Sequence, residues 1–370
     1  MTVVFAGGGT GGHLYPAIAI ADALRKGNAR ISFVGTADRL EARIVPRAGY
    51  ELHEIAARPL RRRLSLDAFV TLAANVWGTL QSLRLLGVER PDLVVATGGY
   101  VCFPLALAAR VRRVLGLSRA PIVLLEPNAA PGLTNRLLAP IVDEIWGAVA
   151  NAQPRFAAKY RETGVPIRSS LQALPKRDDA LARLRLNPAY RTLLAMGGSQ
   201  GARTINDAVL AAADTLPAGW QILHVTGRDD YDRVRTALEA SPAGSTPRRA
   251  VAYLDDMADA YAAADLIVTR AGASTLGELA ALGKPAILIP YPFAAEGHQE
   301  LNAERFASAG AAVVIADRDV AAAFAALLAQ TANPQRLAEL TGAARRMPRS
   351  DAVEAVLARI DALVPRKGRT

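Results

Sequence analysis

The chain has 370 residues, of which 51% are hydrophobic and 21% are charged. This composition excludes a disordered chain, and the length favours two domains over one. The single cysteine, Cys102, excludes a disulfide framework and a cysteine-rich zinc site and is typical of a reducing compartment. We find neither the pattern of a secretory signal nor an uncharged apolar run of the ~18–20 residues that a membrane-spanning helix needs.

The positive charge lies almost entirely in the first half of the chain. Residues 1–168 carry 21 Lys and Arg against 12 Asp and Glu, a net charge of +9 out of +10 for the whole chain. We therefore expect this half to meet an anionic partner, such as a phosphate, a nucleic acid or a lipid surface.

A strand, a glycine loop and a helix follow one another twice. Thr2–Ala6 is an apolar strand, and the loop GGGTGGH at Gly7–His13 leads into a helix through Ala23. The second strand, Thr192–Met196, leads through GGSQGA (Gly197–Ala202) into a helix from about Asn206. Short apolar strands that alternate with amphipathic segments predict parallel sheets covered by helices on both faces. Further strands are expected at Ile31–Val34, Leu93–Ala96, Ile122–Leu125, Ile145–Trp146, Gln221–Val225, Leu266–Thr269 and Ala286–Ile289.

Because the succession of strand, glycine loop and helix occurs twice, we predict an α/β protein with two doubly wound domains. The boundary is expected within Gly164–Arg168, which gives an N-terminal domain at 1–165 and a C-terminal domain at 166–349. A last amphipathic helix is expected within Ser350–Val364.

Glycine loops of this kind let helix amides approach a pyrophosphate. Gly7, Gly9 and Gly12 satisfy the GxGxxG spacing, which is also typical of an ordinary tight turn. A nicotinamide enzyme is one alternative. Such an enzyme would need an acidic residue at the end of the second strand, but Asp38 lies several residues beyond that end. A nicotinamide site would also leave the second glycine loop without a role.

Several motifs, in order along the chain, resemble those of the MurG family, bacterial glycosyltransferases of family 28. They are the two glycine loops, ATGGYV (Ala96–Val101), PGLTNRLLA (Pro131–Ala139), YLDDMADAYAAADL (Tyr253–Leu266) and TRAGASTLGELAALGKPAILIPYP (Thr269–Pro292). The resemblance implies the GT-B fold, in which two Rossmann-like domains face each other across a cleft and the last helix (350–370) crosses back to the first domain.

The resemblance also implies an activity. It is inverting transfer of N-acetylglucosamine (GlcNAc) from UDP-GlcNAc to the C4 hydroxyl of N-acetylmuramic acid in lipid I, which gives lipid II for peptidoglycan synthesis. The enzyme would be a peripheral protein at the cytoplasmic face of the bacterial inner membrane.

By this resemblance the C-terminal domain binds UDP-GlcNAc. Glu278 would accept hydrogen bonds from the ribose hydroxyls, although Thr275 and Glu278 also fit a helix capping box. Ser199 and the loop amides would hold the diphosphate, supported by Arg168. The other donor contacts would come from Gly198, the Leu254 backbone at uracil, Ala273, Ser274, Thr275, and, at the sugar, His298, Gln299 and Asn302.

By the same resemblance the N-terminal domain binds the acceptor. Thr10, Gly11 and Gly12 would contact its pyrophosphate, and Tyr100, Asn128 and Asn135 would line the acceptor cleft. The reaction needs a base for the acceptor hydroxyl, and the two candidates are His13 and Glu126.

We expect neither a metal ion nor a cofactor to be required for donor binding. No Asp-x-Asp motif follows a strand, and the adjacent pair Asp255-Asp256 suits a helix cap.

A basic and apolar segment suggests contact with an anionic membrane. Four arginines precede a predicted helix whose Phe69, Leu72, Val76, Trp77 and Leu80 recur at helical spacing. The alternative is that this stripe packs on the sheet. The arginines before the helix are Arg58, Arg61, Arg62 and Arg63, and those after its apolar stripe are Arg84, Arg90, Arg110, Arg112, Arg113 and Arg119.

The chain departs from the family pattern at three places. The family usually has His-Glu-Gln-Asn where this chain has Leu125-Glu126-Pro127-Asn128, so leucine replaces the histidine and proline the glutamine. Val165 replaces a usual asparagine, and Cys102 replaces a usual serine. Two rival functions remain at this stage. A GT-B-fold epimerase would bind the same UDP-sugar without a lipid acceptor, and a nucleic-acid binder is disfavoured because no recognition helix or interleaved aromatic residues accompany the arginines.

Overall fold

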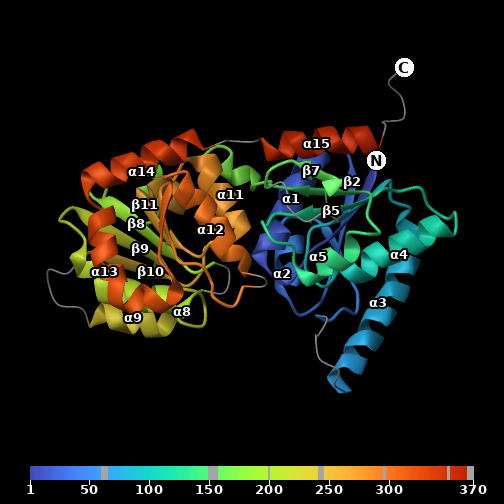
Figure 1. The fold of residues 1–370 in the computed structure, drawn as a ribbon, viewed down its shortest axis with the longest axis horizontal. Coiled ribbons are helices and arrows are strands. Elements are labelled where there is room, and N and C mark those ends of the chain that lie inside the picture. The colour runs from blue at the N-terminus through green and yellow to red at the C-terminus, as the bar shows by residue number, and fades with distance from the viewer. Residues whose placement is uncertain are drawn as a thin grey trace. The chain divides into compact units, whose positions relative to one another are not determined.

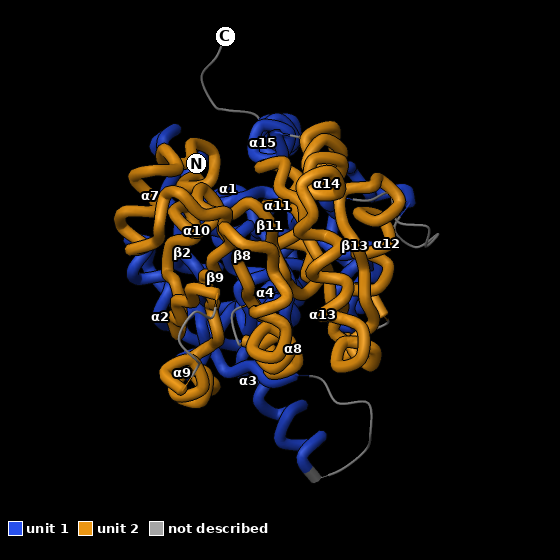
Figure 2. Tube along the Cα trace, turned by 90° about the vertical axis from the view of Figure 1, so that its left-hand side faces the viewer, with its two compact units in different colours: residues 1–168, 350–370 blue, residues 169–349 orange. Residues whose placement is uncertain are grey.

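The computed structural model describes residues 1–59, 66–148, 157–198, 201–240, 246–294, 297–347 and 351–364. The chain divides into two compact units, shown in blue and orange in Figure 2. Unit 1 comprises Met1–Arg168 and Ser350–Thr370, and unit 2 comprises Ser169–Arg349. The last helix, α15 (Ala352–Leu363), therefore belongs with the first part of the chain.

Unit 1, on the right in Figure 1, contains a parallel sheet among its helices. The sheet has seven strands in the order β3-β2-β1-β4-β5-β6-β7. Its central strands are unbroken apolar runs because helices bury them on both faces. The strands are β1 (Thr2–Ala6), β2 (Arg30–Gly35), β3 (Glu51–Glu54), β4 (Leu93–Ala96), β5 (Ile122–Glu126), β6 (Glu144–Gly147) and β7 (Tyr160–Glu162). The helices are α1 (Gly11–Lys26), α2 (Leu40–Arg47), α3 (Leu66–Glu89), α4 (Cys102–Val114), α5 (Leu133–Leu138) and α15.

Unit 2 repeats this plan with a six-stranded parallel sheet in the order β10-β9-β8-β11-β12-β13. The strands are β8 (Arg191–Met196), β9 (Trp220–Val225), β10 (Arg248–Val251), β11 (Leu266–Thr269), β12 (Ala286–Leu288) and β13 (Ala312–Val314). The helices are α7 (Arg177–Arg183), α8 (Arg203–Ala212), α9 (Tyr231–Glu239), α10 (Ala258–Ala263), α11 (Ala273–Leu282), α12 (His298–Ser308), α13 (Val320–Thr331) and α14 (Pro334–Arg346).

Both sheets reverse their strand order at the strand that carries a glycine loop. β1 pairs with β2 on one side and β4 on the other, and β8 pairs with β9 and β11 in the same way. In open parallel sheets, ligands bind beyond the carboxyl ends of the strands at such a switch point. The fold therefore places each glycine loop where a ligand site is expected, and the predicted α/β class with two doubly wound domains is confirmed.

Helix α15 is fixed to unit 1 by apolar and charged contacts. Val356 and Ile360 are buried in the same cluster as Phe5 and Trp146. Arg359 donates to the carboxylate of Glu144 on β6, which also accepts a hydrogen bond from Trp146 Nε1 at 2.8 Å. Burial of Glu144 opposes its ionisation, but the guanidinium and indole donors outweigh this and lower the pKa of its carboxyl.

Candidate functional site

The first glycine loop leaves β1 at Ala6 and starts α1. A Cβ atom at Gly7 would lie 2.1 Å from Thr97 Oγ1, and Gly9 has a left-handed φ of +81°, so the loop needs glycine at both positions. Thr10 is the exposed N-cap residue, and its side chain makes no capping hydrogen bond. The first amides of this 16-residue helix, at Gly11 and Gly12, thus stand at the carboxyl end of the sheet, which suits an anion.

His13 lies in the first turn of α1 and is oriented by the end of β4. Its Nδ1 is 3.1 Å from the carbonyl oxygen of Thr97. A carbonyl only accepts, so the neutral ring carries its proton on Nδ1 and Nε2 is the basic nitrogen. Gly98, at φ +108°, makes room for the ring, since a Cβ there would lie 2.3 Å from Nδ1. The arrangement matches a positioned general base.

Glu126, the second candidate base, is bound by two asparagine side chains. Oε1 accepts hydrogen bonds from Asn128 N (3.0 Å) and Nδ2 (3.1 Å), and Oε2 accepts one from Asn135 Nδ2 (2.7 Å). Only 1% of the residue is exposed, and burial raises the pKa of its carboxyl although these donors oppose the shift. Glu126 therefore positions Asn128 and Asn135, and Pro127 leaves this network intact.

The second glycine loop joins β8 to α8. A Cβ atom at Gly197 would lie 2.1 Å from Ala202 N, and one at Gly201 (φ +77°) would lie 2.5 Å from Thr226 O. Gly198 has φ +81° and would place a Cβ in open space, so its glycine is required by the backbone angle alone. The predicted phosphate ligand Ser199 lies outside the described residues.

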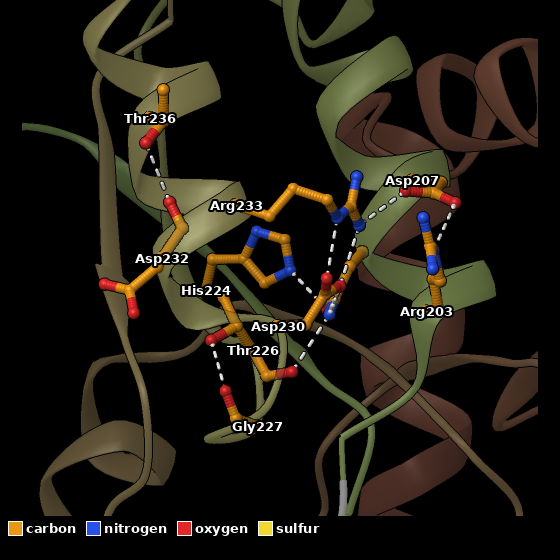
Figure 3. Close-up of polar contacts among 10 residues, drawn as sticks. Arg203, Asp207, His224, Thr226, Gly227, Asp230, Asp232, Arg233 and Thr236 are labelled. Atoms are coloured by element: carbon orange, nitrogen blue, oxygen red, sulfur yellow. Dashed lines mark hydrogen bonds and ion pairs between the residues drawn. The ribbon is translucent and has the colours of Figure 1, made fainter.

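A buried polar network, drawn in Figure 3, holds the first turn of α8 against the loop after β9. Asn206 Nδ2 donates to Thr226 O at 2.9 Å and to Asp230 Oδ2 at 2.7 Å. Arg233 Nε donates to Asp230 Oδ1 at 2.6 Å, and its Nη2 lies 2.7 Å from Asp207 Oδ1. No periodic pattern or motif predicted this network, which ties the start of α8 to its neighbours.

His224 completes the network with a defined proton position. Both Asn206 Nδ2 hydrogens go to oxygens that only accept, so Asn206 Oδ1 faces His224 Nε2 at 2.9 Å. Nε2 must therefore be the donor in the neutral ring. Burial lowers the pKa of His224 from 6.5 to about 4, which keeps the ring neutral near neutral pH.

Helix α11 presents the predicted donor residues at its amino end. Gly272 is the N-cap, so Ala273, Ser274 and Thr275 form the first turn. The capping-box alternative for Thr275 and Glu278 is wrong because the helix starts two residues before Thr275. Glu278 instead accepts a hydrogen bond from the buried Tyr261 hydroxyl at 2.6 Å, and only 6% of it is exposed.

Two predicted sugar ligands on α12 also fix the loop before α11. Gln299 Oε1 accepts hydrogen bonds from Ala271 N at 3.1 Å and Tyr291 N at 2.9 Å, and Asn302 Nδ2 donates to Ala271 O at 3.3 Å. The two N–H donors define the orientation of the Gln299 amide, which leaves its Nε2 as a donor. His298, the first residue of α12, follows the left-handed N-cap Gly297.

The other predicted donor residues are placed as follows. Leu254 follows β10 and is half-buried, outside any strand. The Arg168 guanidinium stacks 4.2 Å above the Tyr15 ring in unit 1. Asp256 Oδ1 accepts hydrogen bonds from Ala258 N (3.0 Å) and Ser170 Oγ (3.1 Å) at the start of α10. In the described part of the chain, no group of three or more His, Cys, Asp or Glu could hold a metal ion.

Helix α3 buries polar side chains up to Ser82 and leaves apolar ones exposed, whereas Leu86 near its end belongs to the apolar core of unit 1. Thr71, Asn75 and Ser82 are at most 4% exposed, and Asn75 Nδ2 donates to Arg58 O at 3.0 Å. A Cβ at Gly78 would lie 1.8 Å from Ala56 O, so this face packs tightly. The predicted stripe does not pack on the sheet. Its exposed fractions are Phe69 72%, Leu72 59%, Val76 53%, Trp77 59% and Leu80 51%.

The amino-terminal turns of α3 project from the rest of unit 1 (Figures 1 and 2). Arg58, Arg84, Arg90 and Arg119 are exposed and Arg110 is half-buried. Arg112 donates to Leu83 O, and Arg113 is paired with Asp143. Arg61, Arg62 and Arg63 lie outside the described residues. Within the described ranges, no helix is both long and apolar enough to cross a membrane.

Tyr100 lies beside the first loop. Its hydroxyl is 3.5 Å from Thr36 Oγ1, and its ring lies 3.6 Å from the place that a Cβ of Gly9 would occupy. Tyr100 belongs to unit 1, as do the predicted acceptor residues Asn128 and Asn135 and the candidate bases His13 and Glu126.

Comparisons with known proteins identify the family of the chain. The chain matches the glycosyltransferase family 28 N-terminal domain over residues 3–146 and the family 28 C-terminal domain over residues 192–356. It is 41% identical to the UDP-N-acetylglucosamine--N-acetylmuramyl-(pentapeptide) pyrophosphoryl-undecaprenol N-acetylglucosamine transferase of Chlorobaculum tepidum, with 98% of this chain and 99% of the relative covered. The equally named protein of Salinibacter ruber is 42% identical, with 98% and 97% covered.

Solved structures show the same fold. The crystal structure of Acinetobacter baumannii MurG has a TM-score of 0.73 at 27% identity, with 98% of this chain and 99% of that one covered. A putative UDP-N-acetylglucosamine 2-epimerase from Listeria monocytogenes has a TM-score of 0.65 at 13% identity, with 98% and 96% covered, which shows a shared fold alone.

The chain thus shares only its fold with the epimerase, whereas it shares sequence with the transferase relatives over nearly its whole length. The chain belongs to glycosyltransferase family 28 and, within it, to the MurG family of hexosyltransferases.

Proposed function

We propose that this protein transfers GlcNAc from UDP-GlcNAc to the C4 hydroxyl of the N-acetylmuramyl group in lipid I, giving lipid II. The observation that carries the proposal is a glycine loop and a helix amino end at the switch point of each of two parallel sheets. One such site suits the acceptor pyrophosphate and the other the donor diphosphate. The names of the relatives specify this donor and this type of acceptor.

In unit 2, the amino ends of α8 and α11 and the side chains around them are proposed to bind UDP-GlcNAc. The amides at Gly198 and Ser199 would hold the diphosphate, aided by the positive charge of Arg168. Glu278, held by Tyr261, would accept hydrogen bonds from the ribose hydroxyls. The remaining contacts would be the Leu254 backbone at uracil, Ala273, Ser274 and Thr275 at the α11 end, and His298, Gln299 and Asn302 at the sugar.

In unit 1, Thr10, Gly11 and Gly12 are proposed to bind the acceptor pyrophosphate, and His13 to act as the base. The C4 hydroxyl would give its proton to His13 Nε2 while its oxygen attacks the α-anomeric carbon and UDP leaves, so that the new link is β-1,4. Thr97 supports this role because it fixes the proton on Nδ1. Glu126 is the weaker candidate, since asparagine donors bind both of its oxygens.

Donor binding is proposed to need neither a metal ion nor a cofactor. The positive ends of α8 and α11, together with the fixed charge of Arg168, would stabilise the leaving diphosphate. Asp256 Oδ1 accepts hydrogen bonds from Ala258 N and Ser170 Oγ beside the start of α10, which supports a structural role for Asp256.

The apolar face of α3 is proposed to rest on an anionic membrane, which would place the enzyme at the cytoplasmic face of the inner membrane, where its lipid acceptor resides. Because more than half of each side chain in the predicted stripe is exposed, the stripe is not part of the core of unit 1. Exposed arginines near it would add attraction of roughly 1 kcal/mol each near an anionic surface. No role in binding nucleic acid is proposed.

A panel of donors and acceptors tests the activity. Purified protein is supplied with UDP-GlcNAc or UDP-glucose, each with and without a lipid I analogue, and release of UDP is measured. We expect release only when UDP-GlcNAc and lipid I are both present. Release of a free 2-epimer or of UDP without an acceptor would refute the proposal.

A further inference from the structure

A buried carboxylate that matches no motif lies under the first glycine loop. Glu41, in the first turn of α2, has no exposed surface. Its Oε2 accepts a hydrogen bond from Gly9 N at 3.0 Å, and its Oε1 accepts hydrogen bonds from Thr36 N at 3.1 Å and Thr36 Oγ1 at 2.9 Å. The side chain therefore ties the loop after β1 to the loop after β2.

Two glycines leave the space that Glu41 fills. A Cβ atom at Gly8 would lie 2.5–2.8 Å from the three carboxyl atoms of Glu41, and one at Gly35 would lie 2.6 Å from its Cγ. Neither glycine has a left-handed φ. The requirement for glycine at these positions is thus one of space around Glu41.

The bond to Gly9 bears directly on the loop that leads into α1. Gly9 has a φ of +81° and directly precedes the N-cap Thr10. Holding the Gly9 amide on Glu41 fixes the direction in which the following residues, Gly11 and Gly12, present their own amides. Loss of this acceptor would leave the part-buried Gly9 N–H without its partner on Glu41, so the loop would move to find another acceptor.

We propose that Glu41 is a positioning residue for the lipid-linked acceptor: it holds the first glycine loop in the form that binds the acceptor pyrophosphate. This inference rests on the proposed function of unit 1. A purely structural role would lower stability and affect both substrates alike, whereas a positioning role changes binding of the acceptor alone.

The variant Glu41→Gln tests the proposal with little change in volume. Whichever way the glutamine amide turns, its NH₂ group faces Gly9 N–H or Thr36 N–H, so one backbone donor loses its acceptor. We expect the KM for a lipid I analogue to rise about 5- to 150-fold, the cost of one backbone donor that loses its acceptor. The KM for UDP-GlcNAc should stay within about twofold. Glu162→Gln, on the exposed edge strand β7, is the matched control and should leave both values unchanged.

A second pair of variants keeps the test valid if Glu41→Gln folds poorly. Gly8→Ala should raise the acceptor KM because the new methyl group displaces the carboxylate. In a Glu41→Ala background the same change should have little effect, since the methyl group then finds space. Additive effects of the two changes would contradict a direct contact.

The outcomes separate this inference from the proposed function. If the wild-type protein transfers no sugar, the proposed function fails. If it is active and Glu41→Gln either keeps the wild-type acceptor KM or raises both KM values equally, only the role of Glu41 is overturned.

Discussion

His13 Nδ1 lies 3.1 Å from the carbonyl oxygen of Thr97, and this contact determines which ring nitrogen can take a proton. Nε2 is left as the basic atom, at the start of α1 and beside the proposed acceptor site. The partner of Nδ1 is a backbone carbonyl, which does not titrate.

Replacing His13 by alanine should therefore lower kcat by about 10²- to 10⁴-fold, the usual contribution of a general base. Affinity for UDP-GlcNAc, measured by calorimetry, should not change, because the residues proposed to bind the donor lie mainly in unit 2. His53→Ala, a histidine on the edge strand β3, serves as the control. A loss of kcat smaller than tenfold would contradict the assignment of His13 as the base and favour Glu126.

Glu278→Ala should weaken binding of UDP-GlcNAc by ~1.5–3 kcal/mol, as expected when a charged hydrogen-bond acceptor is lost. Isothermal titration with UDP-GlcNAc measures this effect, and thermal unfolding checks that the variant is folded. The exposed Glu304→Ala on α12 provides the comparison. Unchanged donor affinity in Glu278→Ala would limit this carboxylate to its contact with Tyr261.

The His224 network predicts a dependence of stability on pH. The pKa of His224 is about 4 in the folded chain and 6.5 ordinarily, so between these values the unfolded chain binds a proton that the folded chain does not. The free energy of unfolding should fall as pH drops through this window, by up to about 3 kcal/mol, and the full contribution should be present above pH 6.5. The pKa of Asp230 is lowered to about 2 by Arg233, so this partner stays ionised throughout.

Urea unfolding of the wild type and His224→Gln between pH 4.5 and 7 measures this contribution. Glutamine can donate to Asn206 Oδ1 and does not titrate, so the variant should lose less stability than the wild type as pH falls. Identical slopes for the two proteins would show that His224 is not the titrating group.

Removing apolar surface from α3 should reduce membrane binding without reducing stability. Phe69 and Trp77 are 72% and 59% exposed, so the double change to serine removes few internal contacts. We expect sedimentation with anionic phospholipid vesicles to weaken at least about tenfold. Phe293→Ser, which changes an 82% exposed aromatic residue of unit 2, should have no such effect. Equal vesicle binding by the wild type, the double variant and Phe293→Ser would contradict a membrane role for α3.

The sequence predicted the central strands well because helices bury them on both faces. Each predicted strand is present within one residue of its bounds, as for Thr2–Ala6 and Leu93–Ala96. Four strands were missed, and all of them form sheet edges: β3, β7, β10 and β13. Edge strands such as Glu51–Glu54 are partly exposed, so they lack the continuous apolar run that marks a buried strand.

Residues of the candidate site could be predicted from the sequence only where they belong to a recognisable motif. Glycine loops are visible in the sequence because their geometry demands glycine at fixed spacing. Glu41 and Asn206 gave no such signal, since their partners, Gly9 and His224, lie 32 and 18 residues away. Helical spacing revealed the apolar stripe of α3, but only the fold shows that this stripe faces outward.

The central claim is that one chain moves GlcNAc from a nucleotide to a lipid-linked acceptor. The most direct measurement uses UDP-GlcNAc labelled in the sugar, a lipid I analogue and purified protein, followed by separation of the lipid from the aqueous phase. We predict that the label enters the lipid fraction in step with UDP release, and that β-N-acetylglucosaminidase releases it. Consumption of UDP-GlcNAc with all of the label remaining in water would contradict the account.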